Sequence, residues 1–275
     1  MQTILVPTDL SSSANVATLY AIQIGNKLSA DVILLHVVSA IQPTSASIRH
    51  KVKNLEKEVF ELAGNDLEAL TNKLAKHSKS AIGLKHKVVQ GASFNQVVKS
   101  ESKKLDVGLI VMGTRGASGL KKYIVGSNTT SVIEVSSVPV LVVPEEAKFK
   151  SFRNVVYATD LKHTEKELLS LIPFLEKFES IVHLIHVAPS AKEALLREEH
   201  IDAIVERIGF KKVVVRVLVN KSVDVAIDHY VTTIKADLLT TFTHEHSFYD
   251  KLFNRSITRQ AAFQSKIPLL AFKHR

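Results

Sequence analysis

Two pairs of small residues have the types and spacing that phosphate binding requires. Gly113 and Gly116 follow the apolar residues 109–112, and Gly126 and Ser127 stand where a helix is expected to begin. Glycine has no Cβ, so a ligand can approach the backbone closely at such a position. The free N–H groups and the dipole at the start of a helix favour an anion, and the Ser127 hydroxyl can cap the helix or donate to a phosphate oxygen. The pattern predicts a phosphate site; the alternative is that these glycines serve only as turn residues.

A second group of candidate residues ends the first apolar run. Pro7, Thr8 and Asp9 come directly after residues 4–6. In an open parallel sheet, ligands bind beyond the carboxyl ends of the strands, where the strand order reverses. Asp9 is therefore expected to contact a ligand, with a turn or capping role as the alternative. His36 ends another apolar run and is expected to make a local hydrogen bond rather than to act as a catalyst.

No pattern in the chain predicts rapid catalysis. The sequence has no cysteine, which excludes a disulfide framework, a thiol nucleophile and a thiolate metal site. A Gly-x-Ser-x-Gly motif, paired carboxylates at a recognisable spacing and a Walker-type loop are all missing. The sequence His244-Glu245-His246 suggests a metal site. Two histidines two residues apart do not form a closed site by themselves and no third ligand is evident, so we expect no metal there. We predict no catalytic residues and no bound metal.

Short apolar runs alternate with amphipathic stretches and would position these residues. Continuous apolar strands separated by helices are typical of a parallel sheet that is covered on both faces. The sequence thus predicts an α/β fold. In the first half we expect strands at residues 3–7, 32–38, 84–90, 107–112 and 140–143, and helices at residues 11–28, 48–77, 94–104 and 127–136.

The chain also repeats itself. Residues 4–10 recur as residues 155–161, residues 32–37 as residues 182–187, and residues 137–142 as residues 266–271. Three landmarks in the same order indicate a duplication. We therefore predict two domains, residues 1–147 and residues 148–275, and expect the second helix of the second copy to be shorter, at about residues 191–208.

The glycine motif in this setting resembles the ATP-binding signature of the universal stress protein family. The likeness extends through both copies and includes the strand endings Pro7-Thr8-Asp9 and His36-Val37. It implies two tandem Rossmann-like domains of the adenine nucleotide alpha hydrolase-like type. Each would hold a five-stranded parallel sheet of order 3-2-1-4-5, with the nucleotide between strands 1 and 4.

The resemblance also assigns roles to single residues. Pro7, Thr8, Asp9 and Val37 would line the adenosine pocket. Met112, Gly113 and Gly116 would pass under the ribose and the phosphates, and the phosphates would be held by Gly126, Ser127, Asn128 and Thr129. The implied ligand is ATP, with or without Mg, and the implied role is stress response or signalling through nucleotide-dependent interaction with other proteins. A slow ATP hydrolase and a ligand-free scaffold are the alternatives.

The second copy lacks the glycines of the motif. Gly113 is replaced by Phe242, Gly116 by Glu245 and Gly126 by Arg255, while Ser127 keeps its type as Ser256. A phenylalanine would fill space near the ribose, and a carboxylate would repel phosphates. We expect no nucleotide in the second domain, where Glu245 and Arg255 could form an ion pair.

Charge and hydropathy limit the classes of partner that we expect. The net charge is +9, but it is spread over both halves without a dense basic run, so nucleic acid is not the expected partner. No apolar run is long enough to cross a membrane and no signal peptide is evident, so we expect a cytoplasmic protein. The fifth strands, residues 140–143 and 269–272, are apolar sheet edges. The family resemblance implies that they pair antiparallel within the chain as a pseudo-dimer, to which a homodimer could be added.

Overall fold

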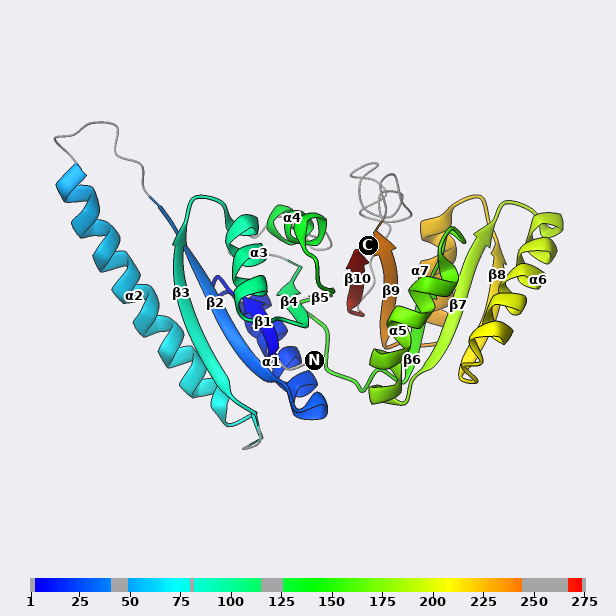
Figure 1. Ribbon diagram of the computed structural model, residues 1–275, viewed down its shortest axis with the longest axis horizontal. Coiled ribbons are helices and arrows are strands. Elements are labelled where there is room, and N and C mark those ends of the chain that lie inside the picture. The colour runs from blue at the N-terminus through cyan, green and yellow to red at the C-terminus, as the bar shows by residue number, and fades with distance from the viewer. Residues whose placement is uncertain (1–2, 41–48, 80–81, 115–125, 244–266, 274–275) are drawn as a thin grey trace. The chain divides into compact units, whose positions relative to one another are not determined.

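The computed structural model describes residues 3–40, 49–79, 82–114, 126–243 and 267–273. The chain divides into two compact units, and the division in the sequence falls between Glu145 and Glu146. Gly116, Glu245, Arg255 and Ser256 lie outside the described residues, as do His244 and His246. Each unit is an α/β structure in which helices pack on a parallel sheet (Figure 1).

The first unit alternates strands and helices without exception among its described residues. In chain order these are β1 (Thr3–Pro7), α1 (Ser12–Leu28), β2 (Asp31–Ser39), α2 (Arg49–Ala75), β3 (Leu84–Gly91), α3 (Phe94–Lys104), β4 (Leu109–Gly113), α4 (Ser127–Val135) and β5 (Val140–Val143). The elements predicted from the hydrophobic pattern are confirmed, with ends that differ by no more than two residues.

The sheet of the first unit has the order β3-β2-β1-β4-β5, and every pair is parallel. This is the predicted order, 3-2-1-4-5. Ile4, Leu5 and Val6 of the central strand β1 are completely buried. Helices cover both faces, which is why the strands are continuous apolar runs rather than alternating ones.

The second unit repeats this topology. Its sheet, in the direction that corresponds to the first, has the order β8-β7-β6-β9-β10, again parallel throughout. The second helix is shorter than its counterpart α2, at 18 residues against 27. The elements are β6 (Asn154–Ala158), α5 (Thr164–Phe178), β7 (Ile181–Ala188), α6 (Ala191–Ile208), β8 (Val213–Val219), α7 (Val223–Thr233), β9 (Leu238–Thr243) and β10 (Leu269–Lys273).

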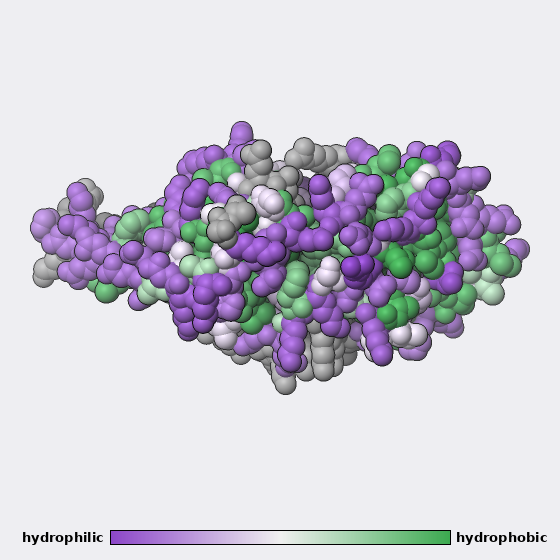
Figure 2. Space-filling view, turned by 90° about the horizontal axis from the view of Figure 1, so that it is seen from below, coloured by the Kyte–Doolittle hydropathy of each residue, from purple (hydrophilic) through white to green (hydrophobic). Residues whose placement is uncertain are grey.

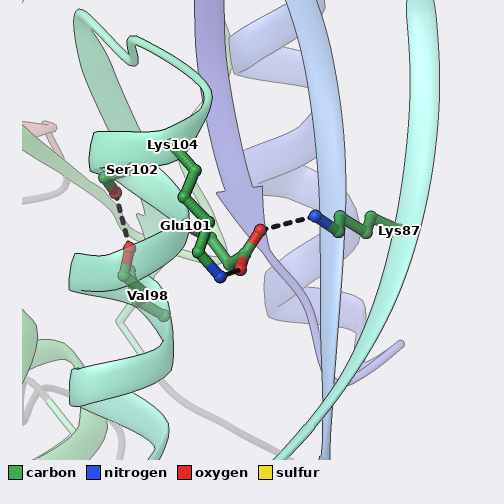
Figure 3. A network of polar contacts seen from close by, with 5 residues as sticks. All are labelled: Lys87, Val98, Glu101, Ser102 and Lys104. Carbon is green, nitrogen blue, oxygen red and sulfur yellow. Dashed lines mark hydrogen bonds and ion pairs between the residues drawn. The ribbon is translucent and has the colours of Figure 1, made fainter.

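An ion-pair cluster fastens α3 to the sheet of the first unit (Figure 3). Glu101 of α3 accepts hydrogen bonds from Lys87 Nζ of β3 at 2.6 Å and from Lys104 Nζ at 2.8 Å. Burial alone would raise the pKa of Glu101, but the two lysines outweigh it and hold that pKa below its usual value. In the second unit, Tyr230 stands at the matching position of α7, and its hydroxyl lies 3.0 Å from Nδ1 of His183 in the second strand, β7.

The molecular surface seen in Figure 2 is mostly hydrophilic, with hydrophobic residues in smaller patches between the charged ones. Among the described residues, no helix combines the length and hydropathy that a membrane span needs. The α2 helix carries several of the exposed apolar side chains, of which Leu62 is the most exposed at 63%.

Candidate functional site

The strand order of the first unit reverses between β1 and β4. From β1 the chain builds outward through β2 to β3, and from β4 it builds the other way to β5. Because the strands are parallel, the carboxyl ends of β1 and β4 lie at the same edge of the sheet. This edge is where open α/β sheets bind ligands, and it is reached by the residues that follow Pro7 and Gly113.

A tight turn leads from β1 into α1. Thr8 is buried, and its Oγ1 accepts a hydrogen bond from Leu10 N at 3.1 Å, while Asp9 Oδ1 accepts one from Ser11 N at 3.1 Å. Leu10 takes a left-handed conformation, with φ 65°. Ser11 then caps α1 by accepting a hydrogen bond from Ala14 N. The turn leaves the Asp9 side chain exposed at the edge between β1 and β4.

The same turn recurs after β6 in the second unit. Thr159 Oγ1 accepts from Leu161 N at 3.0 Å, and Asp160 Oδ1 accepts from Lys162 N at 3.1 Å. Leu161 is again left-handed, with φ 68°. Both copies thus use threonine and aspartate to build the turn itself. These residue types at this spacing are therefore a property of the fold, whether or not a ligand is bound.

His36 has the local hydrogen bond that the sequence predicts. Its Nδ1 lies 2.8 Å from the carbonyl oxygen of Thr8. The counterpart His186 lies 2.9 Å from the carbonyl oxygen of Thr159. Each histidine ties the second strand of its unit to the turn beyond the first, which is a structural role.

Gly113 ends β4 directly beneath the first turn of α1. A Cβ at this position would lie 2.9 Å from the backbone carbon and oxygen of Ser13, and closer still to the Ser13 hydroxyl. Its φ is not in the left-handed region. Gly113 is therefore required by the close packing of α1 on β4. The sequence predicts a ligand role for this glycine but not its packing role, because nothing in the local sequence reveals that Ser13 faces it.

Residues at the start of α4 complete this edge of the sheet. Gly126 is the N-cap residue, and its backbone N–H donates to the Thr114 carbonyl at 2.7 Å. No side chain among the described residues caps the helix. Ser127 and Asn128, the first two helical residues, are exposed. Ser127 is thus not the N-cap residue, and its side chain lies at the surface of the first turn.

The Thr129 hydroxyl is used within the protein. It donates to the Gly113 carbonyl oxygen at 3.0 Å, and the Thr129 side chain is buried. This bond joins the start of α4 to the end of β4. A phosphate would therefore meet the N–H groups of this turn and the exposed Ser127 and Asn128 side chains more readily than the Thr129 hydroxyl.

The other predicted residues lie in the strands that end at this edge of the sheet. Pro7 and Met112 are buried in β1 and β4, and Val37 is half-buried in β2. A contact that the sequence did not predict joins Ser12 of α1 to Glu145, whose Oε1 lies 2.5 Å from the serine Oγ. Glu145 follows β5, so this contact brings a carboxylate to the first turn of α1. No local pattern signals a pair that is separated by 133 residues.

In the second unit, an aromatic side chain occupies the position of Gly113. Phe242 is the last residue but one of β9 and is 6% exposed. Its ring stacks on Phe272 of β10 with 4.8 Å between centroids and meets the edge of Tyr157 at 5.8 Å. The carboxyl end of β9 is therefore packed with rings. Among the described residues of the whole chain, no cluster of three His, Cys, Asp or Glu side chains could hold a metal ion.

Comparison with known proteins gives one family. The model of the universal stress protein family matches residues 1–144. The universal stress protein Slr1230 of Synechocystis is 26% identical over 99% of this chain and 100% of its own length. The crystal structure of a universal stress protein from Archaeoglobus fulgidus has a TM-score of 0.62 and 21% identity, and covers 99% of this chain and 96% of its own, which establishes the tandem fold. A universal stress protein solved in complex with cAMP is 26% identical, with a TM-score of 0.37, and covers 52% of this chain and 96% of its own.

Proposed function

Because the chain belongs to the universal stress protein family, we propose that its first unit binds an adenine nucleotide, ATP in the first place, at the edge where β1 and β4 end. The observation that carries the proposal is the open first turn of α4. Its N-cap is a glycine, no described side chain caps it, and Ser127 and Asn128 are exposed beside the end of β4. A helix start in this setting favours phosphate.

The remaining residues fit the nucleoside. Asp9 presents an exposed carboxylate that can accept hydrogen bonds from ribose hydroxyls or from an adenine amino group. Pro7, Val37 and Met112 are apolar and lie in the last three residues of their strands, where they can line an adenosine pocket. Gly116 belongs to the proposed phosphate loop and lies outside the described residues. The second unit has a phenylalanine in place of Gly113, so we propose one nucleotide per chain.

A calorimetric titration with ATP, with and without Mg, tests the proposal. Ser127→Asp is the most informative variant. A carboxylate in the first turn interacts favourably with the helix dipole, so the helix stays stable, but the same charge repels phosphate. We expect one site per chain in the wild type and at least a tenfold weaker affinity in Ser127→Asp, with the melting temperature preserved. Parallel titrations with ADP, AMP and cAMP rank the ligands.

Asp9→Asn and Asp160→Asn form a matched pair. Each asparagine keeps an Oδ1 that can accept the turn hydrogen bond, so both variants remove a charge without breaking the turn. Asp9→Asn should weaken the binding and Asp160→Asn should leave it unchanged. Equal losses in the two variants, or two sites per chain, would contradict a single site in the first unit. No binding by any of the nucleotides would favour the ligand-free scaffold.

The proposed role in the cell is signalling through other proteins. Nucleotide in the first unit would place phosphate charge at the start of α4, and a partner would recognise that surface. Slow hydrolysis of ATP is a separate alternative, and a release of phosphate that Ser127→Asp abolishes would favour it.

A further inference from the structure

The second unit contains polar side chains where the first has apolar ones. Tyr157, Glu167, Thr240 and Thr241 are each no more than 2% exposed. At the corresponding positions of the first unit stand Val6, Val16, Val111 and Met112. Burial of polar groups costs stability unless they are well satisfied. The duplication thus offers an internal comparison between an apolar and a polar version of one core.

Glu167 lies at the centre of this polar cluster. The Tyr157 hydroxyl of β6 donates a hydrogen bond to Glu167 Oε2 of α5. Thr240 of β9 is paired in register with Tyr157. The hydroxyls of Thr240 and Thr241 are buried and have no hydrogen-bond partner among the described residues. This carboxyl–phenol contact joins α5 to the central strand β6, in a core that also holds the buried threonine hydroxyls.

The charged groups that act on Glu167 lie between the end of β6 and the start of α5. Burial raises the pKa of Glu167 to about 7, against the hydrogen bond from Tyr157; Asp160 raises it further and His163 at the start of α5 lowers it. The neighbouring strand β9 contributes Thr240 and Phe242, which are uncharged. Burial and the nearby carboxylate keep the pKa of Tyr157 well above its usual value, so its hydroxyl remains a neutral donor.

We propose that Glu167 makes the second unit sensitive to protons: its neutral form docks α5 on β6, and its ionised form loosens that helix. The buried carboxyl holds its proton in the folded unit at pH values where it would lose it in the unfolded chain. The first unit has Val16 at this position and lacks the device. The proposal concerns the second unit alone and does not depend on nucleotide binding.

The direction of the effect follows from proton linkage. The folded unit binds more protons than the unfolded chain between the ordinary value of 4.5 and about 7. Its stability therefore falls as the pH rises through this window and levels off above it. Between pH 5 and pH 8 the opening equilibrium of α5 should rise by roughly tenfold to a hundredfold.

Hydrogen exchange of the full chain, followed by mass spectrometry, tests the proposal. Exchange rates are corrected for the intrinsic effect of pH and converted to opening equilibria for the peptides of α5 and, as an internal control, of α1. We expect α5 to open more at pH 8 than at pH 5 and α1 to change by less than threefold. In Glu167→Gln the pH dependence of α5 should disappear, because glutamine keeps an acceptor for Tyr157 without a titrating proton.

Two further variants separate ionisation from packing. Glu165→Gln removes an exposed carboxylate two residues away on the same helix, which pairs with Arg207, and should keep the wild-type pH dependence. If Glu167→Gln folds poorly, Glu167→Val restores the residue of the first copy and should also be independent of pH. A pH dependence that survives in the Glu167 variants, or that is equal in α1 and α5, would overturn the proposal.

Discussion

Gly113 and Phe242 show how one position can serve two purposes. The backbone of α1 packs closely on β4, whereas α5 lies less closely against β9. A side chain is excluded in the first case and accepted in the second, where the ring joins Tyr157 and Phe272. The glycine of the phosphate motif is thus also a packing glycine. Loss of binding on its substitution would not by itself identify a ligand contact.

This packing makes a prediction for Gly113→Ala. The new methyl group would lie 2.9 Å from the Ser13 backbone, so α1 must shift, and we expect a loss of about 1–3 kcal/mol in the free energy of unfolding. Gly64→Ala is the control, because no atom lies within 4 Å of its Cβ position in α2. There we expect a gain of about 0.5–1 kcal/mol from helix propensity. Urea unfolding measures both, and an unchanged stability in Gly113→Ala would refute the packing role.

At the scale of the element, the two copies fasten the third helix to the sheet by different chemistry and at different strands. In the first unit, Glu101 of α3 joins Lys87 and Lys104. In the second, Tyr230 of α7 meets His183 of β7, the second strand of that unit. The position on the helix is kept, while the residue types and the strand that supplies the partner change.

Glu101→Gln should weaken the first unit by about 1–2 kcal/mol at neutral pH, a modest figure because both lysines are partly exposed and screened. The pKa of Glu101 is lowered, so its stabilising contribution is present above the ordinary value of 4.5 and lost as the pH falls through the lower folded value. The variant should therefore lose less stability than the wild type on acidification. Glu61→Gln, at an exposed i,i+4 pair with Lys57, serves as the control and should behave as the wild type.

At the scale of the whole molecule, the pairing of the two fifth strands stays a prediction. The family resemblance implies that β5 and β10 run antiparallel within one chain. The chain has no cysteine of its own, so any disulfide that forms in a double-cysteine variant must join the two introduced cysteines. Two cysteines can be bridged when their Cα atoms lie about 4.4–6.8 Å apart.

Val140→Cys combined with Lys273→Cys places one cysteine at the start of β5 and the other at the end of β10. Antiparallel pairing should let this pair oxidise within the chain, whereas Val140→Cys with Leu269→Cys should not. Gel shifts under oxidising conditions measure the outcome. The reverse preference would indicate parallel pairing, and cross-linking only between chains would favour a homodimer through these edges.

The sequence by itself determined the elements and the duplication, and it predicted the candidate site. Hydrophobic periodicity is a local property, so residues 94–104 were recognised as a helix that the structure places at Phe94–Lys104. Strand order came from the resemblance that the glycine motif supports, and the structure confirms it.

Only the tertiary structure decided which distant residues meet. Ser13 lies over Gly113, Ser12 reaches Glu145, and Tyr157 holds Glu167. Each contact joins elements that the crossovers bring together, and its geometry depends on how closely a helix settles on its sheet. That distance is set by the summed packing of the whole core, which no local pattern of residues encodes.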